Sequence, residues 1–123
     1  MTYYGTKQLA ESFRTVRNNT IQVAQDIPED KYQFKAADDT RTVEKLLTHI
    51  ALATRFQYTI HSEGRTTLVG MNFPAFFQEM AAEEAKPRTK AQVIELLRTE
   101  GEKWASFVEG VSEQSLSDVI TMP

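Results

Sequence analysis

Apolar residues recur at helical spacing in three long segments of the chain. Between residues 6 and 27 the stripe consists of Leu9, Phe13, Val16, Val23, Ala24 and Ile27, with Thr20 filling its gap. A second stripe covers residues 43–61 and a third covers residues 91–111. Apolar positions three and four residues apart indicate amphipathic helices, so the pattern predicts three long helices.

Prolines and small polar residues mark where these helices begin and end. Pro28 ends the first helix and opens a single turn, and residues 32–37 alternate weakly, as in an extended connection that lays its aromatic side chains on the helices. Thr42 supplies an N-cap for the second helix, although Lys45 lacks the side chain of a full capping box. Thr89 is a good N-cap for the third long helix.

A short fourth helix is predicted from Pro74, a first-turn proline, through Ala85. Its apolar side consists of Phe73, Phe76, Phe77 and Met80. These residues suit either a plain core or a cap over a ligand pocket, since phenylalanine and methionine are common in pocket walls.

No stretch alternates long enough to build a sheet, so we expect one all-α domain over residues 1–123. The predicted buried core comprises Leu9, Phe13, Val16, Val23, Leu46, Ile50, Leu97, Trp104 and Val108. In this orientation Glu44 faces solvent, so Leu46→Ala should lower the unfolding midpoint more than Glu44→Ala. Gly101, inside the third long helix, predicts a close helix contact or a pocket beside Trp104.

Composition narrows the possible functions. A net charge of −3 without a lysine or arginine cluster argues against a nucleic-acid-binding protein. The absence of cysteine excludes disulfides and thiolate metal sites and agrees with a reducing cytoplasm. The chain has no signal-peptide pattern and no apolar run of about 18 residues, so we expect a cytoplasmic protein without membrane segments.

His49 is the main candidate for chemistry. At about 100° per residue, Val43, Leu46, Leu47, Ile50 and Ala53 share the apolar face, and His49 lies at its border. The imidazole is either a metal ligand or a core-edge side chain bonded to a backbone carbonyl or a carboxylate. The other histidine, His61, lies about 18 Å further along the same helix and cannot share a metal with it.

Two other polar residues are weaker candidates for a functional site. Glu100, near the apolar edge of the third long helix, is either a base or outer-shell carboxylate or simply a solvated charge. Gln57 lies in the middle of the apolar face of the second helix, where it either lines a pocket or forms a satisfied core amide.

The chain resembles the DinB/YfiT-like superfamily of metal-dependent proteins. The resemblance rests on the Ile-Pro-Glu-Asp-Lys-Tyr turn at 27–32, on Arg41-Thr42-Val43, and on Leu46-Leu47-Thr48-His49-Ile50-Ala51. It implies an up-and-down four-helix bundle in which His49 joins two histidines of a last helix, spaced by four, to hold a divalent metal such as Zn²⁺ or Ni²⁺. Superfamily members include thiol-dependent S-transferases and isomerases.

The last helix of that bundle and its two histidines do not occur in these 123 residues. We therefore expect three long helices and one short helix here, a partial sequence or a fourth bundle helix supplied by another copy, and a homodimer. We also expect weak or no stoichiometric metal in these residues alone.

Two functions remain open. The complete protein would be a metal-dependent enzyme of hydrolase or thiol S-transferase type, acting on a small molecule with His49 as a ligand. Alternatively, the chain is a non-catalytic helical module that self-associates, with His49 structural.

Overall fold

The computed structural model describes residues 4–123, and its described part is all-α. The four helices are α1 (Thr6–Asp26), α2 (Val43–Ser62), α3 (Phe73–Ala85) and α4 (Lys90–Gly110), and two short 3-10 turns are η1 (Glu29–Lys31) and η2 (Glu113–Ser117). The extended pieces make only isolated bridges, which join Lys35 to Thr42 and Thr67 to Thr121. The predicted three long helices and one short helix are confirmed.

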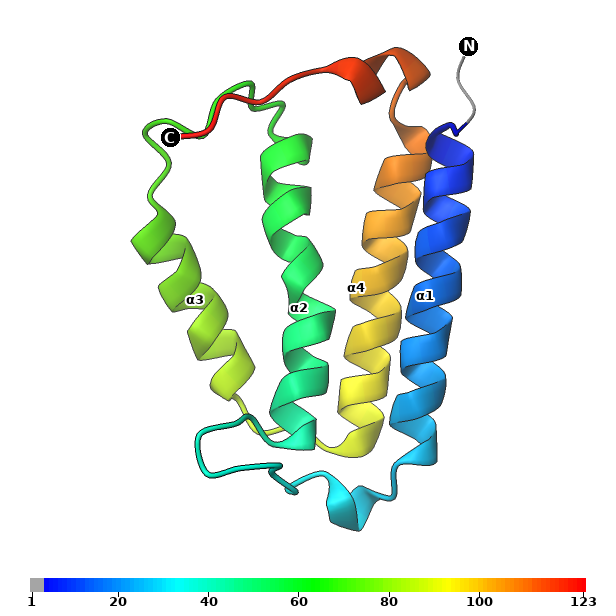
Figure 1. The fold of residues 1–123 in the computed structure, drawn as a ribbon, viewed down its shortest axis with the longest axis vertical. Coiled ribbons are helices and arrows are strands. Elements are labelled where there is room, and N and C mark those ends of the chain that lie inside the picture. Colours follow the sequence, from blue (N-terminus) through cyan, green and yellow to red (C-terminus); the bar gives the residue numbers. More distant parts are fainter. Residues whose placement is uncertain (1–3) are drawn as a thin grey trace.

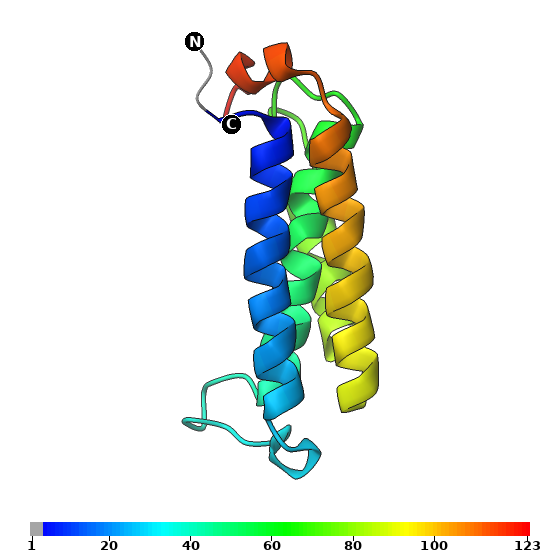
Figure 2. The ribbon, with the colours of Figure 1, turned by 90° about the vertical axis from the view of Figure 1, so that its right-hand side faces the viewer.

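The helices lie side by side in the order α3, α2, α4, α1, and the chain direction alternates from each helix to the next in sequence (Figure 1). Turned by 90°, the molecule shows α1 and α4 in front of α2 and α3 (Figure 2). Helix α4 packs against both α1 and α2, whereas α3 packs mainly on α2. No helix in the described residues is long and apolar enough to cross a membrane.

The helix boundaries follow the predicted capping residues. The hydroxyl of Thr42 accepts a hydrogen bond from the backbone N–H of Lys45 at 3.1 Å and so caps α2. Thr89 caps α4 by accepting from the N–H of Gln92, whose side chain accepts from the N–H of Thr89 in return. This reciprocal pair satisfies two N–H groups that the first turn of a helix leaves free, which explains where α4 begins.

A buried arginine joins the three long helices. The side chain of Arg17, on α1, is 7% exposed and donates to the carbonyl of Leu97 on α4 at 2.8 Å and to that of Ile50 on α2 at 3.3 Å. Burial lowers the pKa of Arg17, while the carboxylate of Glu100 raises it. A Cβ atom on Gly101 would lie 2.8 Å from Cγ of Arg17. The close contact expected at Gly101 is therefore with Arg17.

The predicted core was largely wrong because α1 and α2 are rotated from the orientation that their apolar stripes suggested. Only Leu97 of the nine predicted residues is fully buried. Phe13, Ile50, Trp104 and Val108 are half-buried, and Leu9, Val16, Val23 and Leu46 are exposed. The buried positions of α1 and α4 instead include Ala10, Ala24, Gly101 and Ala105, whose small size lets two helices approach closely.

The rotation of α2 reverses the expected roles of Glu44 and Leu46. Glu44 is 5% exposed and accepts hydrogen bonds from the side chain of Gln33 and the backbone N–H of Arg88, whereas Leu46 is 49% exposed. The orientation behind the prediction that Leu46→Ala is the more destabilising substitution is therefore wrong, because Glu44 and not Leu46 is buried. Gln57 is exposed rather than central to a buried face, so its predicted role was also wrong.

We predict that Gly101→Ala lowers the free energy of unfolding by about 1–3 kcal/mol, because the new methyl group must displace a hydrogen-bonded Arg17. Gly110→Ala, at the end of the same helix, is the matched control, since nothing lies within 4 Å of its added Cβ. Urea unfolding of both variants measures the difference. A Gly101→Ala protein as stable as Gly110→Ala would show that Arg17 does not need this space.

Candidate functional site

His49 lies on the side of α2 that faces α3 and is bonded to a carboxylate there. Its Nδ1 atom is 2.9 Å from Oε2 of Glu84, in the last turn of α3. The other oxygen of that carboxylate, Oε1, accepts a hydrogen bond from Nε of Arg41, just before α2 begins. The His49 side chain is 49% exposed and that of Glu84 is 18% exposed. His49 thus lies at the edge of the helix packing, where its ring is held by Glu84, and Glu84 is itself paired with Arg41.

The charge on Glu84 determines which nitrogen of the His49 ring carries the proton. Burial raises the pKa of Glu84, but hydrogen bonds and charge from Arg41 and His49 more than offset it, so the pKa lies below its usual value. An ionised carboxylate only accepts hydrogen bonds, so Nδ1 of His49 must carry the proton that it shares with Glu84. In the neutral ring Nε2 then keeps its lone pair. Nε2 is therefore the atom that can bind a metal or accept a proton.

A pocket of about 360 Å³ lies beside this pair, between α2 and α3. Apart from Arg41, His49 and Glu84, its lining is apolar and consists of Leu52, Ala53, Phe56, Phe76, Phe77, Met80 and Ala81. Such a wall with few polar groups is typical of a small-molecule site.

Aromatic contacts hold α3 in place at this pocket. The ring of Phe56 on α2 lies 5.5 Å from that of Phe76 and 6.0 Å from that of Phe77. No residue of α3 is buried, so the plain core that its apolar side suggested is wrong. The apolar side of α3 forms a pocket wall instead.

The described residues supply one ring nitrogen for a metal and no complete ligand set. Within residues 4–123, no group of three or more histidine, cysteine, aspartate or glutamate side chains could hold a metal ion. His61 lies against Trp104, with ring centroids 6.1 Å apart, and does not line the His49 pocket. Glu100 is bonded to Arg55 and lines a different pocket. The structure therefore does not unite His49 with Glu100.

Sequence reasoning missed the partner of His49. Glu84 is separated from it by 35 residues, including a loop whose path the sequence does not specify. The only available signal was a glutamate in the last turn of a short helix with one apolar side, a position shared by many solvated charges. Arg41 was noted as part of a motif, but its contact with Glu84 depends on the same loop.

The Glu84 carboxylate should make stability depend on pH. Because the folded-state pKa is lowered, its contribution is present above the ordinary glutamate pKa and is lost as the pH falls through the folded-state value. Glu84→Gln should cost about 1 kcal/mol at pH 7, and the gap from wild type should shrink toward about pH 3. Urea unfolding over this range tests it. Glu95→Gln, whose parent side chain is 67% exposed, is the control, and a gap that widens in acid would contradict the assignment.

Comparison with protein families matches the chain to the DinB superfamily over residues 12–123. Comparison with curated proteins and with solved structures found no match. The family match covers all four helices except the first turns of α1 and includes His49, Glu84 and Arg41. The fold class and the family resemblance expected from the sequence are both confirmed. The chain belongs to the DinB superfamily.

Proposed function

We propose that this chain contributes His49 as a ligand to a divalent-metal site in an enzyme of hydrolase or thiol-dependent S-transferase type. The observation that carries the proposal is the His49–Glu84 pair beside an apolar pocket. Metal-binding histidines commonly donate their other ring N–H to a carboxylate, which orients the ring and raises the basicity of the ligating nitrogen. Glu84 has this position relative to His49, and Arg41 holds Glu84.

Zinc and nickel are the metals of choice for such a site because both accept imidazole nitrogen. A divalent metal with an open coordination position makes water or a thiol nucleophilic at neutral pH, which is the chemistry that either reaction type would use. The apolar pocket beside His49 would hold the body of a small substrate. The cytoplasm, which is reducing, would suit a cysteine-free protein that uses a free thiol.

The remaining ligands must come from outside the described residues, and a second copy of the chain is one source. Leu9, Val16 and Val23 of α1 are 37%, 63% and 53% exposed, and Leu46 of α2 is 49% exposed, so apolar side chains of both helices face solvent. Exposed apolar surface of this kind favours association. We therefore include a homodimer in the proposal.

The same apolar stripes support the alternative function, a helical module that self-associates without catalysis. In that case the His49–Glu84 pair would serve only to fasten α3 to α2. The two functions differ in whether the free nitrogen of His49 binds metal.

Metal titration distinguishes them. Protein purified as its full natural polypeptide is loaded with Zn²⁺ or Ni²⁺, and bound metal is measured by elemental analysis alongside sedimentation. We expect His49→Ala to abolish the bound metal and leave helical content unchanged, since the His49 side chain is half-exposed. Glu84→Gln should weaken metal binding by about 10- to 100-fold through loss of the orienting carboxylate.

His61→Ala is the matched control because the chain has only these two histidines. It should bind metal as the wild type does. Metal retained in full by His49→Ala would overturn the ligand assignment. A wild-type protein that forms dimers and takes up no metal would favour the non-catalytic module.

A further inference from the structure

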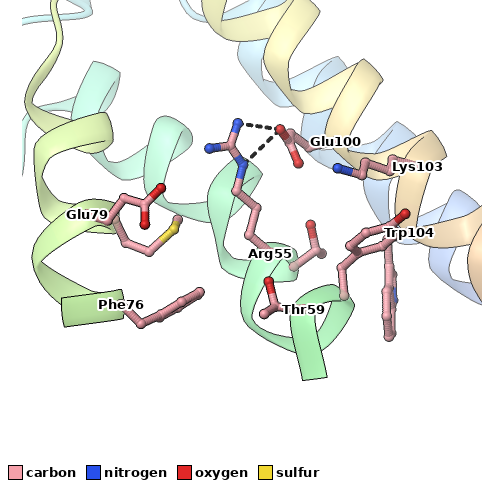
Figure 3. Close-up of a pocket in the computed structure, with 10 residues that line it drawn as sticks. Arg55, Thr59, Phe76, Glu79, Glu100, Lys103 and Trp104 are labelled. Atoms are coloured by element: carbon pink, nitrogen blue, oxygen red, sulfur yellow. Dashed lines mark hydrogen bonds and ion pairs between the residues drawn. The ribbon is translucent and has the colours of Figure 1, made fainter. Parts of the chain in front are cut away.

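A second pocket, of about 300 Å³, lies between α2, α3 and α4 (Figure 3). Its charged side chains are Arg55 from α2, Glu79 from α3, and Glu100 and Lys103 from α4. None of these four residues lines the pocket beside His49, and the two pockets share only Phe76 and Met80 of α3. The second pocket is therefore a separate candidate site.

Two of the four charges neutralise each other. Nε and Nη2 of Arg55 both donate to Oε1 of Glu100, at 2.9 and 2.6 Å (Figure 3). The Glu100 side chain is only 12% exposed, so this charge-assisted pair is partly shielded from water. Arg55 and Glu100 together form a neutral part of the wall between α2 and α4.

The other two charges have no such partner. Within residues 4–123, neither Glu79 nor Lys103 takes part in any hydrogen bond of its side chain or any ion pair. The Nζ atom of Lys103 instead lies 4.3 Å from the centroid of the Tyr58 ring. Figure 3 shows Glu79 and Lys103 on opposite sides of the pocket, with Arg55 between them.

The rest of the wall offers apolar contact. Phe76 from α3 and Trp104 from α4 line the pocket on the same sides as the unpaired carboxylate and ammonium groups (Figure 3). Aromatic side chains supply a large contact area to the body of a small ligand. In the described residues the pocket thus combines a carboxylate and an ammonium group, neither of which forms an ion pair, with an aromatic surface.

We propose that this pocket binds a small zwitterion with an apolar body and its two charges at opposite ends, such as a dipeptide. The ligand's carboxylate would meet Lys103, its ammonium group would meet Glu79, and its side chain would pack on Phe76 and Trp104. A simple anion would be repelled by the carboxylate of Glu79, and a simple cation would be repelled by the ammonium group of Lys103. A molecule that carries both charges therefore fits better than either. This inference does not depend on metal binding at His49.

Trp104 is the only tryptophan of the chain and lines this pocket, so its fluorescence responds to a ligand bound there. It also lines a pocket beside His61, so the substitutions below show which pocket the response comes from. The probe is alanyl-leucine, titrated beside its N-acetylated and its C-amidated form, with leucine, whose two charges share one carbon, as the control. We expect a saturable change with alanyl-leucine. Blocking either charge should weaken that binding about tenfold, the loss typical of one charge-assisted hydrogen bond.

Substitutions locate the two contacts. Lys103→Gln and Glu79→Gln should each weaken the binding of the zwitterion about tenfold, whereas Lys7→Gln and Glu11→Gln, on the exposed surface of α1, should leave it unchanged. All four residues are exposed, so the variants should keep the fold, which circular dichroism checks. The proposal is overturned if alanyl-leucine gives no saturable response, if the blocked forms bind equally well, or if Lys103→Gln binds as the wild type does.

Discussion

The arrangement of the long helices depends on the hydrogen bonds that the buried guanidinium of Arg17 donates. The guanidinium reaches from α1 to backbone carbonyls of α4 and α2, and it fits because residue 101 has no side chain. A buried cation without hydrogen-bonded partners would be costly, so the positions of these carbonyls relative to α1 are constrained. The contact therefore constrains how α2 is rotated about its own axis, together with the packing of α2 on α4.

That rotation decides which residues of α2 are available for function. With Glu44, Thr48 and Ala51 turned inward, His49 faces α3 and Leu46 faces solvent. Helix α3 has no buried residue of its own. It is attached to α2 through the contact of Phe76 with Phe56 and through the hydrogen bond between Glu84 and His49. Both pockets exist because α3 stands beside α2 instead of filling a core, so its side chains can form walls on either side.

The sequence predicted well where the helices begin and end, but it predicted poorly which face of each helix is buried. Helix limits depend on local signals such as Thr42, Thr89 and Pro28, and these hold within a residue or two. Burial depends on which neighbour a helix meets. Leu9, Val16 and Val23 of the α1 stripe face solvent, while a face with alanines and Arg17 packs inward. His49 was identifiable from its motif, but its partner Glu84 depends on a loop path that periodicity does not encode.

Glu84 holds the His49 ring by Nδ1 and leaves Nε2 free. Long-range ¹H–¹⁵N correlation NMR at a pH where both histidines are neutral shows which ring nitrogen carries the proton. We expect His49 to carry its proton on Nδ1 in the wild type and to lose this preference in Glu84→Ala, while the spectrum of His61 stays the same. A wild-type His49 with its proton on Nε2, or one unaffected by Glu84→Ala, would contradict it.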